Sequence, residues 1–370
     1  ADSASSDVFL TVAGADGSRE HLVTTLQPFA WSDEPEEAST PQEGDATWCH
    51  RRHFPDATTW KEAMNDKDGP ARDTVKPLEH QWLIAHQARL FQGLALDHLR
   101  RVTVVLQTRP GSGEGGPDPM DKADRVLVIG LAYPDGHDGI TTELRELPED
   151  TDAAERQLLK DFAARLRELD PDVIEGHAAN KVALDYLQKR GRRFRVPAQW
   201  GRYGQKASFR NSRLRVAERW IDYPRASVPG RAIFDTELMV QLYDLAAREL
   251  PGYTLAEVAE HLDLDGGEGD GPNFLTTAEA AAAFDDDREG LRANLRKQIR
   301  QSRALADLLL PTYAAQALNL PMTLQEICLR GTGAKVESLL IERYLTAGAA
   351  LPEPPEVTTF EGAFTKSFRT

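Results

Sequence analysis

The sequence has few cysteines and no long apolar run. Its 370 residues include two cysteines, Cys49 and Cys328, which could form at most one disulfide. The longest apolar runs, Val102 to Leu106 and Val126 to Leu131, are far too short to span a bilayer. Because no basic start followed by an apolar segment precedes the first predicted strand, we expect no secretory signal. These absences predict a cytoplasmic protein with no membrane partner.

The sequence also lacks a convincing cluster of metal ligands. Cys49, His50 and His53 lie close together. A zinc site would normally need a second pair of ligands nearby, and the sequence has none there. We therefore interpret this stretch as a half-buried loop.

Positive charge is scarce overall but concentrated in one stretch. The chain has 44 basic and 59 acidic residues, a net charge of −15, which argues against a nonspecific nucleic-acid coat protein. Between Lys189 and Arg219, however, lie eleven basic residues and one acid. Aromatic residues such as Trp200 and Trp220 accompany them, a mixture that suits phosphates and unstacked bases, although a solvated basic hairpin without a ligand would look the same. The candidate contacts to nucleic acid here are Arg192, Arg193, Arg195, Arg202, Lys206 and Arg210.

Hydrophobic periodicity predicts an α/β protein. Three predicted strands are followed by an amphipathic helix, a short strand at Val173 and Ile174, and a helix from Lys181 to Lys189. The strands are Leu99–Thr108, Arg125–Tyr133 and Ile140–Leu147, the last two paired antiparallel, and the amphipathic helix is Asp152–Leu169. Further along we predict a strand at Arg231–Asp235 and helices at Thr236–Leu250 and at Leu291–Leu310, the latter ended by Pro311. Capping boxes at Thr254 with Glu257 and at Thr276 with Glu279 predict two more helix starts.

The start of the chain predicts a smaller α+β domain. It has a strand at Asp7–Asp16, an acidic exposed loop at Ser32–Thr47 and a helix at Leu78–Gly93. We expect three parts: an N-terminal domain at 1–97, a central domain at 98–320 with a basic hairpin at 189–219, and a connector at 321–370.

One stretch carries a recognisable motif. In PDVIEGHAANKVALDYLQKRG, from Pro171 to Gly191, a strand ends in a polar turn that leads into a helix. It resembles the second exonuclease motif of family B DNA polymerases, roughly D-x-I-x-G-H-N-x-x-x-F-D-x-x-Y-L. Asp172, Gly176 and His177 fit, but Ala183 stands at the position of the metal-binding aspartate.

Three other stretches resemble motifs of the same family, in the family's order. Leu99–Thr108 is similar to the first exonuclease motif, with Val105 at its aspartate and Gln107 at its glutamate. Leu291–Leu310 is similar to the third, with Asn294 at its tyrosine and Gln298 at its aspartate. FEGAF, from Phe360 to Phe364, is similar to the motif between the exonuclease and polymerase domains.

The resemblance implies a ribonuclease-H-like exonuclease fold with a mixed sheet and flanking helices, in a polymerase of the bacterial type. In this family, carboxylates hold a pair of divalent ions such as Mg²⁺. Here the four acidic positions hold Val105, Gln107, Ala183 and Gln298, none of which supplies an anionic oxygen. We therefore expect no metal, no cofactor and no exonuclease activity in this chain, with Mg²⁺ left to the polymerase domains of the parent family.

The resulting functional hypothesis is a nucleic-acid-binding, proofreading-deficient part of a family B DNA polymerase. Its expected partners are DNA, as a single strand or primer-template, and a polymerase palm domain in the same or another chain. Phe360 and Gly362 would lie at the passage between the two sites, and Lys335 and Lys366 would contact phosphates. Two alternatives stay open: a free-standing scaffold subunit, and an active exonuclease with relocated ligands drawn from Glu175, Asp185, Asp235 and Asp307.

Overall fold

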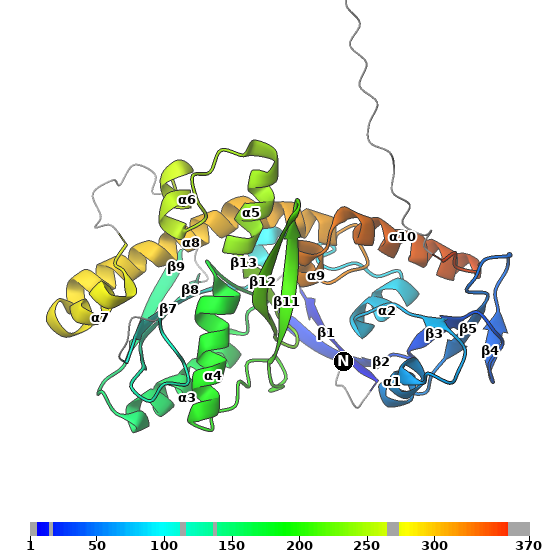
Figure 1. The fold of residues 1–370 in the computed structure, drawn as a ribbon, viewed down its shortest axis with the longest axis horizontal. Coiled ribbons are helices and arrows are strands. Elements are labelled where there is room, and N and C mark those ends of the chain that lie inside the picture. The colour runs from blue at the N-terminus through cyan, green and yellow to red at the C-terminus, as the bar shows by residue number, and fades with distance from the viewer. Residues whose placement is uncertain (1–5, 15–17, 112–115, 136–138, 265–273, 354–370) are drawn as a thin grey trace, which may run out of the picture. The chain divides into compact units, whose positions relative to one another are not determined.

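The computed structural model describes residues 6–14, 18–111, 116–135, 139–264 and 274–353. Among them the chain forms two compact units (Figure 1). The first unit takes its described residues from the ranges 1–8, 24–86 and 340–370, and the second from 9–23 and 87–339. These units differ from the expected division at residues 97 and 320. In the second unit, residues from both sides of each expected boundary pack around one buried cluster that includes Leu320, among them Leu90, Phe91, Tyr313 and Leu339.

The second unit is built on a five-stranded mixed sheet in the order β13-β10-β7-β8-β9. Strand β10 is parallel to β7 and β13, whereas β8 is antiparallel to β7 and β9. The strands are β7 (Arg101–Arg109), β8 (Arg125–Pro134), β9 (Ile140–Glu146), β10 (Val173–Gly176) and β13 (Ala232–Asp235). Dense β-branched residues explain why β7 and β8 are central and buried. The antiparallel pairing of the second and third predicted strands is confirmed.

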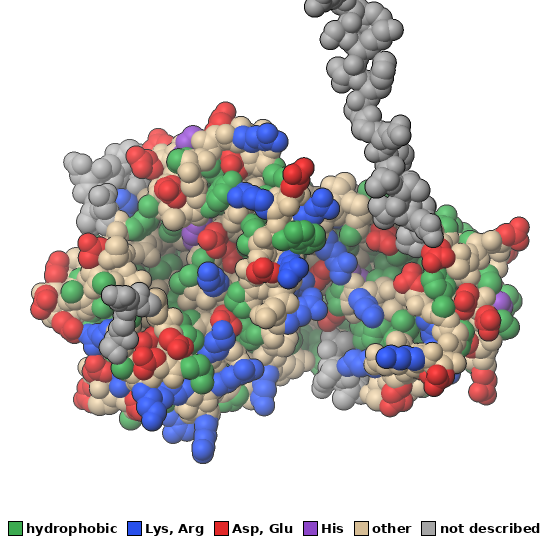
Figure 2. Space-filling view, viewed as in Figure 1, with side chains coloured by type: hydrophobic (Ala, Val, Ile, Leu, Met, Phe, Trp, Pro, Cys, Tyr) green, Lys and Arg blue, Asp and Glu red, His purple; other side chains and the backbone are tan. Residues whose placement is uncertain are grey.

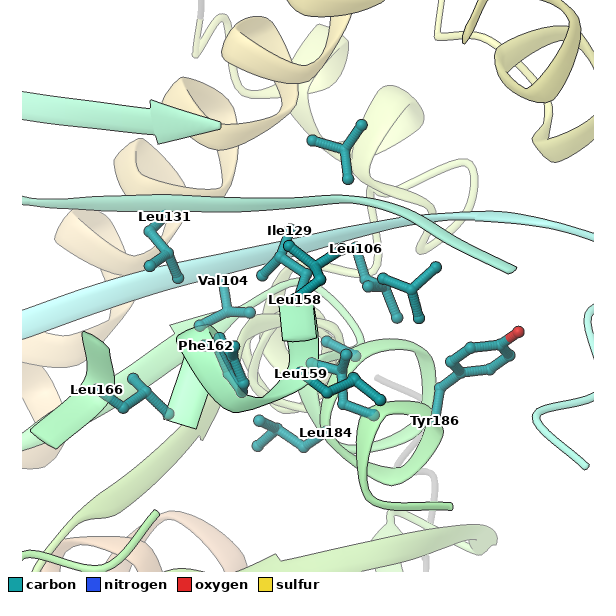
Figure 3. Packing of buried hydrophobic residues seen from close by; sticks show 14 of the residues in the cluster. Val104, Leu106, Ile129, Leu131, Leu158, Leu159, Phe162, Leu166, Leu184 and Tyr186 are labelled. Atoms are coloured by element: carbon teal, nitrogen blue, oxygen red, sulfur yellow. The ribbon is translucent and has the colours of Figure 1, made fainter. Parts of the chain in front are cut away.

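Alternation along β7 separates the two faces of this sheet. Val104 and Leu106 point into a core formed with helix α3 (Asp152–Leu169), as Figure 3 shows. The register places Val105 opposite Gly130, and a Cβ on Gly130 would lie 2.8 Å from Ile299. Ile299 belongs to α8 (Arg288–Ala317), so α8 covers the face that carries Val105. A side chain at position 130 would therefore displace the end of the Ile299 side chain.

The helices begin and end largely where local signals predicted, with one exception. Helix α3 has the predicted bounds, and both capping boxes form, at α6 (Leu255–His261) and α7 (Thr277–Asp286). Helix α8, in contrast, continues through Pro311, so the predicted helix end was wrong. Proline in a helix interior costs about 3 kcal/mol, but Leu309, Leu310 and Ala314 around it are buried, and this burial outweighs the lost hydrogen bond. The other helices of this unit are α4 (Tyr186–Arg193), which follows a π-helix at Ala179–Asp185, α5 (Thr236–Ala247), α9 (Leu324–Leu329) and η1 (Leu96–His98).

Two-stranded ribbons complete the second unit. Strands β11 (Ser208–Val216) and β12 (Arg219–Ser227) pair only with each other, and β1 (Asp7–Ala13) pairs with β2 (Arg19–Thr25). The predicted hairpin at 189–219 was therefore misplaced. Residues up to Arg193 belong to α4, and the reversal falls after Val216, where Ala217 adopts a positive φ of 53°.

The first unit is a smaller α+β unit with a four-stranded sheet in the order β4-β5-β3-β6. Its elements are β3 (Phe29–Ser32), β4 (Ser39–Pro41), β5 (His50–His53), β6 (Arg72–Asp73), α1 (Ala57–Asn65) and α2 (Leu78–Ala85). Phe29 and Trp31 pack on one side of β3, and Ala30 packs on the other with Phe54 and Trp60. The stretch from His50 to His53 forms a strand instead of the expected loop. The predicted helix from Leu78 ends early at Ala85. Helix α10 (Thr332–Ala347) has residues in both units.

Candidate functional site

The positions expected for the first exonuclease motif lie on β7. Val105 and Gln107 are two residues apart and share one side of the strand, the side that α8 covers at Val105. The Gln107 side chain is buried and its amide nitrogen donates to the Thr108 carbonyl (2.9 Å). Neither side chain carries a charge, so β7 contributes no anionic ligand at this point.

The expected positions of the other motifs lie on the two elements that pack against β7. Ala183 is buried in the π-helix beside the core that also holds Leu184 (Figure 3). Gln298 lies on α8, where its side chain donates to Oδ1 of the fully buried Asn294 (2.8 Å). The structure thus brings the three motif-bearing elements together, with a valine, an alanine and two glutamines at the acidic positions. Within the ranges the structure describes, no group of three or more His, Cys, Asp or Glu side chains could hold a metal ion. The residues present therefore do not fit a pair of divalent ions.

The turn after β10 explains why Gly176 and His177 occur together. A Cβ on Gly176 would lie 2.6 Å from the Val104 carbonyl oxygen, so only glycine fits there. His177 Nε2 donates to the Tyr253 carbonyl (2.8 Å), and Nδ1 is 3.2 Å from the Thr236 hydroxyl. Burial lowers the pKa of His177 to about 4, so the ring is neutral and holds the turn to the segments around it. This histidine is a structural anchor of the turn.

Glu175 and Asp307, two candidates for relocated ligands, are engaged in an ion-pair cluster. The fully buried Glu175 accepts from Arg101 Nε (2.8 Å) and the Thr103 hydroxyl (2.9 Å), and lies 3.3 Å from Arg303. Asp307 pairs with Arg101 (2.5 Å) and lies 3.6 Å from Arg303. Both carboxylates are paired with buried arginines and neutralise their charge. A metal ion, itself a cation, could not take over that role.

Asp235 and Asp185, the other candidates, are also engaged. Desolvation raises the pKa of Asp235, which is buried and accepts from the backbone (2.9 Å) and side-chain (3.0 Å) nitrogens of Asn180. Asp185 pairs with Lys189 one turn later (2.7 Å). The sequence reasoning missed Asn180; its one signal was an asparagine just inside a turn after a buried strand.

Two of the basic residues grouped with the candidate interface are structural. Arg190 is fully buried and donates to both oxygens of Glu155 (2.6 and 2.9 Å) and to the Asp121 carbonyl (2.5 Å). Arg202 is also withdrawn from solvent and pairs with Asp170 (2.8 Å) and Asp172 (2.7 Å). The guanidinium of Arg202 is already paired with two carboxylates, and its predicted contact with nucleic acid stays a prediction.

The remaining predicted contacts differ in exposure. Arg193 is partly buried, 3.5 Å from Asp152 and beside the Phe194 ring. Four others lie in solvent, at the end of α4, in the loop after it and on β11: Arg192, Arg195, Lys206 and Arg210. Figure 2 shows Lys and Arg side chains over α4 and over the ribbon β11–β12. Phe360, Gly362 and Lys366, with the whole FEGAF stretch, lie outside the described residues.

The ribbon β11–β12 presents a polar outer face. Opposite residues share a face, so Arg213 with Asp222 and Arg215 with Trp220 form two adjacent pairs. Arg213 and Asp222 are 2.8 Å apart and both are largely exposed. The Arg215 guanidinium lies 5.9 Å from the centre of the Trp220 ring, and Trp220 is 59% exposed. The other face packs Leu214, Val216 and Tyr223 against the core.

Comparison with known proteins covers the second of these motifs, and the positions assigned to the first and third stay predictions. Residues 142–258 match the model of the family described as DNA polymerase family B, exonuclease domain. This part of the chain is similar to the exonuclease domain of family B DNA polymerases. A DNA polymerase of Archaeoglobus fulgidus is 26% identical over 68% of the chain and 29% of its own length, and DNA polymerase 2 of Aeropyrum pernix is 28% identical over 65% and 27%. The chain thus spans less than a third of the length of these curated polymerases.

The fold of a solved family B polymerase is also similar. The structure of the enzyme from Pyrobaculum calidifontis matches with a TM-score of 0.70 and 19% identity, over 96% of this chain and 50% of that one. It supports the ribonuclease-H-like α/β fold of the exonuclease domain. The bacterial type expected from the motifs stays a prediction, since these relatives come from Archaeoglobus, Aeropyrum and Pyrobaculum. No helix within the described ranges is long and apolar enough to span a membrane.

Proposed function

We propose that this chain is a nucleic-acid-binding, catalytically silent exonuclease region of a family B DNA polymerase. One observation carries the proposal: β7, the π-helix and α8 pack together, yet the positions where the motifs call for acids hold Val105, Gln107, Ala183 and Gln298. Metal-assisted phosphodiester cleavage needs several carboxylates that converge on ions about 4 Å apart. Without them no hydroxide forms beside the scissile phosphate, and no ion stabilises the leaving oxygen.

Binding requires less than cleavage. A strand can be held by exposed guanidinium groups along its phosphates and by an aromatic ring under an unpaired base. The outer face of the ribbon β11–β12 offers both, through Arg213, Arg215 and Trp220. Arg192, Arg195, Lys206 and Arg210 would extend the positive surface. Because the chain has a net charge of −15, this binding is local and sensitive to salt.

The whole protein's activity belongs to the same proposal. We expect DNA synthesis, in the cytoplasm, by a palm domain in the same or another chain, with Mg²⁺ bound there. A free-standing scaffold subunit is the alternative. The coding DNA beyond Thr370 discriminates between them: an in-frame D-x-x-S-L-Y-P-S palm motif supports the polymerase, and an immediate stop codon supports the subunit.

The test is incubation of the purified chain with end-labelled single-stranded DNA and Mg²⁺ or Mn²⁺, followed by native and denaturing gels. We expect a shifted strand of unchanged length. Replacing Arg213 and Arg215 with glutamine should weaken the shift, whereas replacing the exposed Lys61 of the first unit should not. Shortened products that vanish with a chelator and with Asp185→Asn or Glu175→Gln would overturn the proposal and identify an active exonuclease with relocated ligands.

A further inference from the structure

The turn that follows β10 is bonded to the base of the ribbon β11–β12 through one side chain. Asn180 is buried, and its two nitrogens both donate to Asp235 Oδ2 (2.9 and 3.0 Å). Its remaining polar atom, Oδ1, accepts from the backbone N–H of Ala226 in β12 (3.0 Å). Apart from its backbone carbonyl, every polar group of Asn180 is thus hydrogen-bonded, and these bonds connect the turn to β13 and β12.

Ala226 is also hydrogen-bonded to a second element, helix α9. The carbonyl of Ala226 accepts from Gln325 Nε2 (2.7 Å), and Gln325 Oε1 lies 3.4 Å from the backbone nitrogen of Ile233. The neighbouring Arg225 donates to Glu326 in a buried ion pair. Both backbone polar groups of Ala226 are therefore satisfied by side chains, from the π-helix and from α9.

These side chains replace a missing strand. The ribbon β11–β12 pairs with no other strand among the described residues. An isolated two-stranded ribbon is marginally stable in water, because each strand has hydrogen bonds on one edge only. Asn180 and Gln325 supply the outer hydrogen bonds at the base of β12, where a third strand would otherwise lie. The direction of the whole ribbon then depends on these hydrogen bonds together with the packing of Leu214, Val216 and Tyr223 on its inner face.

We propose that Asn180 is a positioning residue for the binding of DNA: it fixes the base of β12 to the vacated exonuclease turn, so that Arg213, Arg215 and Trp220 face a bound strand in one orientation. The proposal rests on the proposed function, since it assumes that the ribbon contacts DNA. In this proposal the turn has a structural role, to hold the base of β12, and this role does not require a metal ion.

The test compares Asn180→Leu with the parent chain in two independent measurements. Leucine is close in size to asparagine but leaves the Asp235 carboxylate and the Ala226 N–H without their side-chain partner. We expect amide exchange in residues 219–227 to accelerate at least tenfold and the affinity for a fluorescently labelled single-stranded oligonucleotide to fall at least threefold. A core truncation in the same unit, Leu131→Ala, serves as the control: it should lower thermal stability without selectively accelerating exchange in the ribbon.

A swap of the two partners provides the rescue. In the double variant Asn180→Asp with Asp235→Asn, the residue 235 amide can still donate to the residue 180 carboxylate, and that carboxylate can still accept from Ala226. The backbone N–H of residue 180 loses its carboxylate acceptor. We therefore expect the swap to restore part of the exchange protection and of the affinity, which a purely space-filling role for residue 180 would not predict.

Two results would overturn the inference, and they are distinguishable. If Asn180→Leu leaves exchange in 219–227 unchanged, Asn180 does not position the ribbon, whatever happens to affinity. If the triple variant Arg213→Gln, Arg215→Gln, Trp220→Ala binds the oligonucleotide as tightly as the parent chain, the ribbon does not contact DNA. In that case the proposed function fails for this surface, and the role of Asn180 in binding fails with it.

Discussion

Replacement of Arg190 by methionine should destabilise the second unit strongly, although this residue lies in the basic stretch between Lys189 and Arg219. The guanidinium makes two hydrogen bonds to Glu155 (2.6 and 2.9 Å) and others to the carbonyls of Pro119, Asp121 and Asp124. Both members of the ion pair are fully buried. Removing one partner of such a pair leaves an uncompensated buried charge and costs about 3–5 kcal/mol.

Two other contacts of Glu155 affect how much the Arg190→Met substitution costs within that range. Glu155 would still accept from the Val126 backbone nitrogen (3.0 Å) and would lie 3.6 Å from Arg125. These contacts reduce the penalty on the carboxylate, but the three carbonyls lose their donor completely, at about 1 kcal/mol or more each. We therefore expect about 4 kcal/mol, an estimate built on the same magnitudes.

The assay is urea unfolding followed by circular dichroism, with amide exchange in α3 and β8 to assign the loss to the second unit. Arg192→Met is the matched control: it lies two residues away on the same helix but is exposed, and should change stability by no more than about 0.5 kcal/mol. Adding Glu155→Leu to Arg190→Met should recover part of the loss, because the buried charge is then gone. A loss below about 1 kcal/mol for Arg190→Met, or equal losses at residues 190 and 192, would show that the buried pair does not support the fold.

Four further predictions concern acid, the core and salt. Burial lowers the folded-state pKa of His177 to about 4, so as the pH falls the imidazole is protonated in the unfolded chain before it is protonated in the folded one. The free energy of unfolding should therefore decrease by up to about 3 kcal/mol between pH 6.5 and 4. His177→Gln should remove that part of the pH dependence. For Asp170, burial alone would raise the pKa, but the Arg202 hydrogen bond and the charges of Arg231 and Arg19 hold it below its usual range; its contribution should be lost below about pH 4, and Asp170→Asn should flatten acid unfolding there. Phe162→Ala should cost about 3–5 kcal/mol in urea unfolding, since this ring is buried in the α3 core. Removing Arg213 and Arg215 should lower the slope of log affinity for single-stranded DNA against log salt by about 1.4, and an unchanged slope would exclude them as phosphate contacts.

Local patterns in the sequence determined much of the fold. The bounds of α3, the capping boxes at Thr254 and Thr276 and the pairing of β8 with β9 are all confirmed. They depend on periodicity and on hydrogen bonds between residues close in the chain, which the sequence displays directly. The sequence also displays, in the family's order, three stretches that resemble exonuclease motifs, and the loss of their acidic positions stays a prediction.

Only the tertiary structure decided which charged side chains are exposed and which are buried in ion pairs. Arg190 and Arg202 look like their exposed neighbours in sequence, but their partners Glu155 and Asp170 lie more than thirty positions earlier along the chain. Helix α8 continues through Pro311 because other elements bury its flanks, and Asn180 acquires its role only when β12 and β13 meet beside it. Burial and long-range partners arise when the chain packs, so no local pattern reports them.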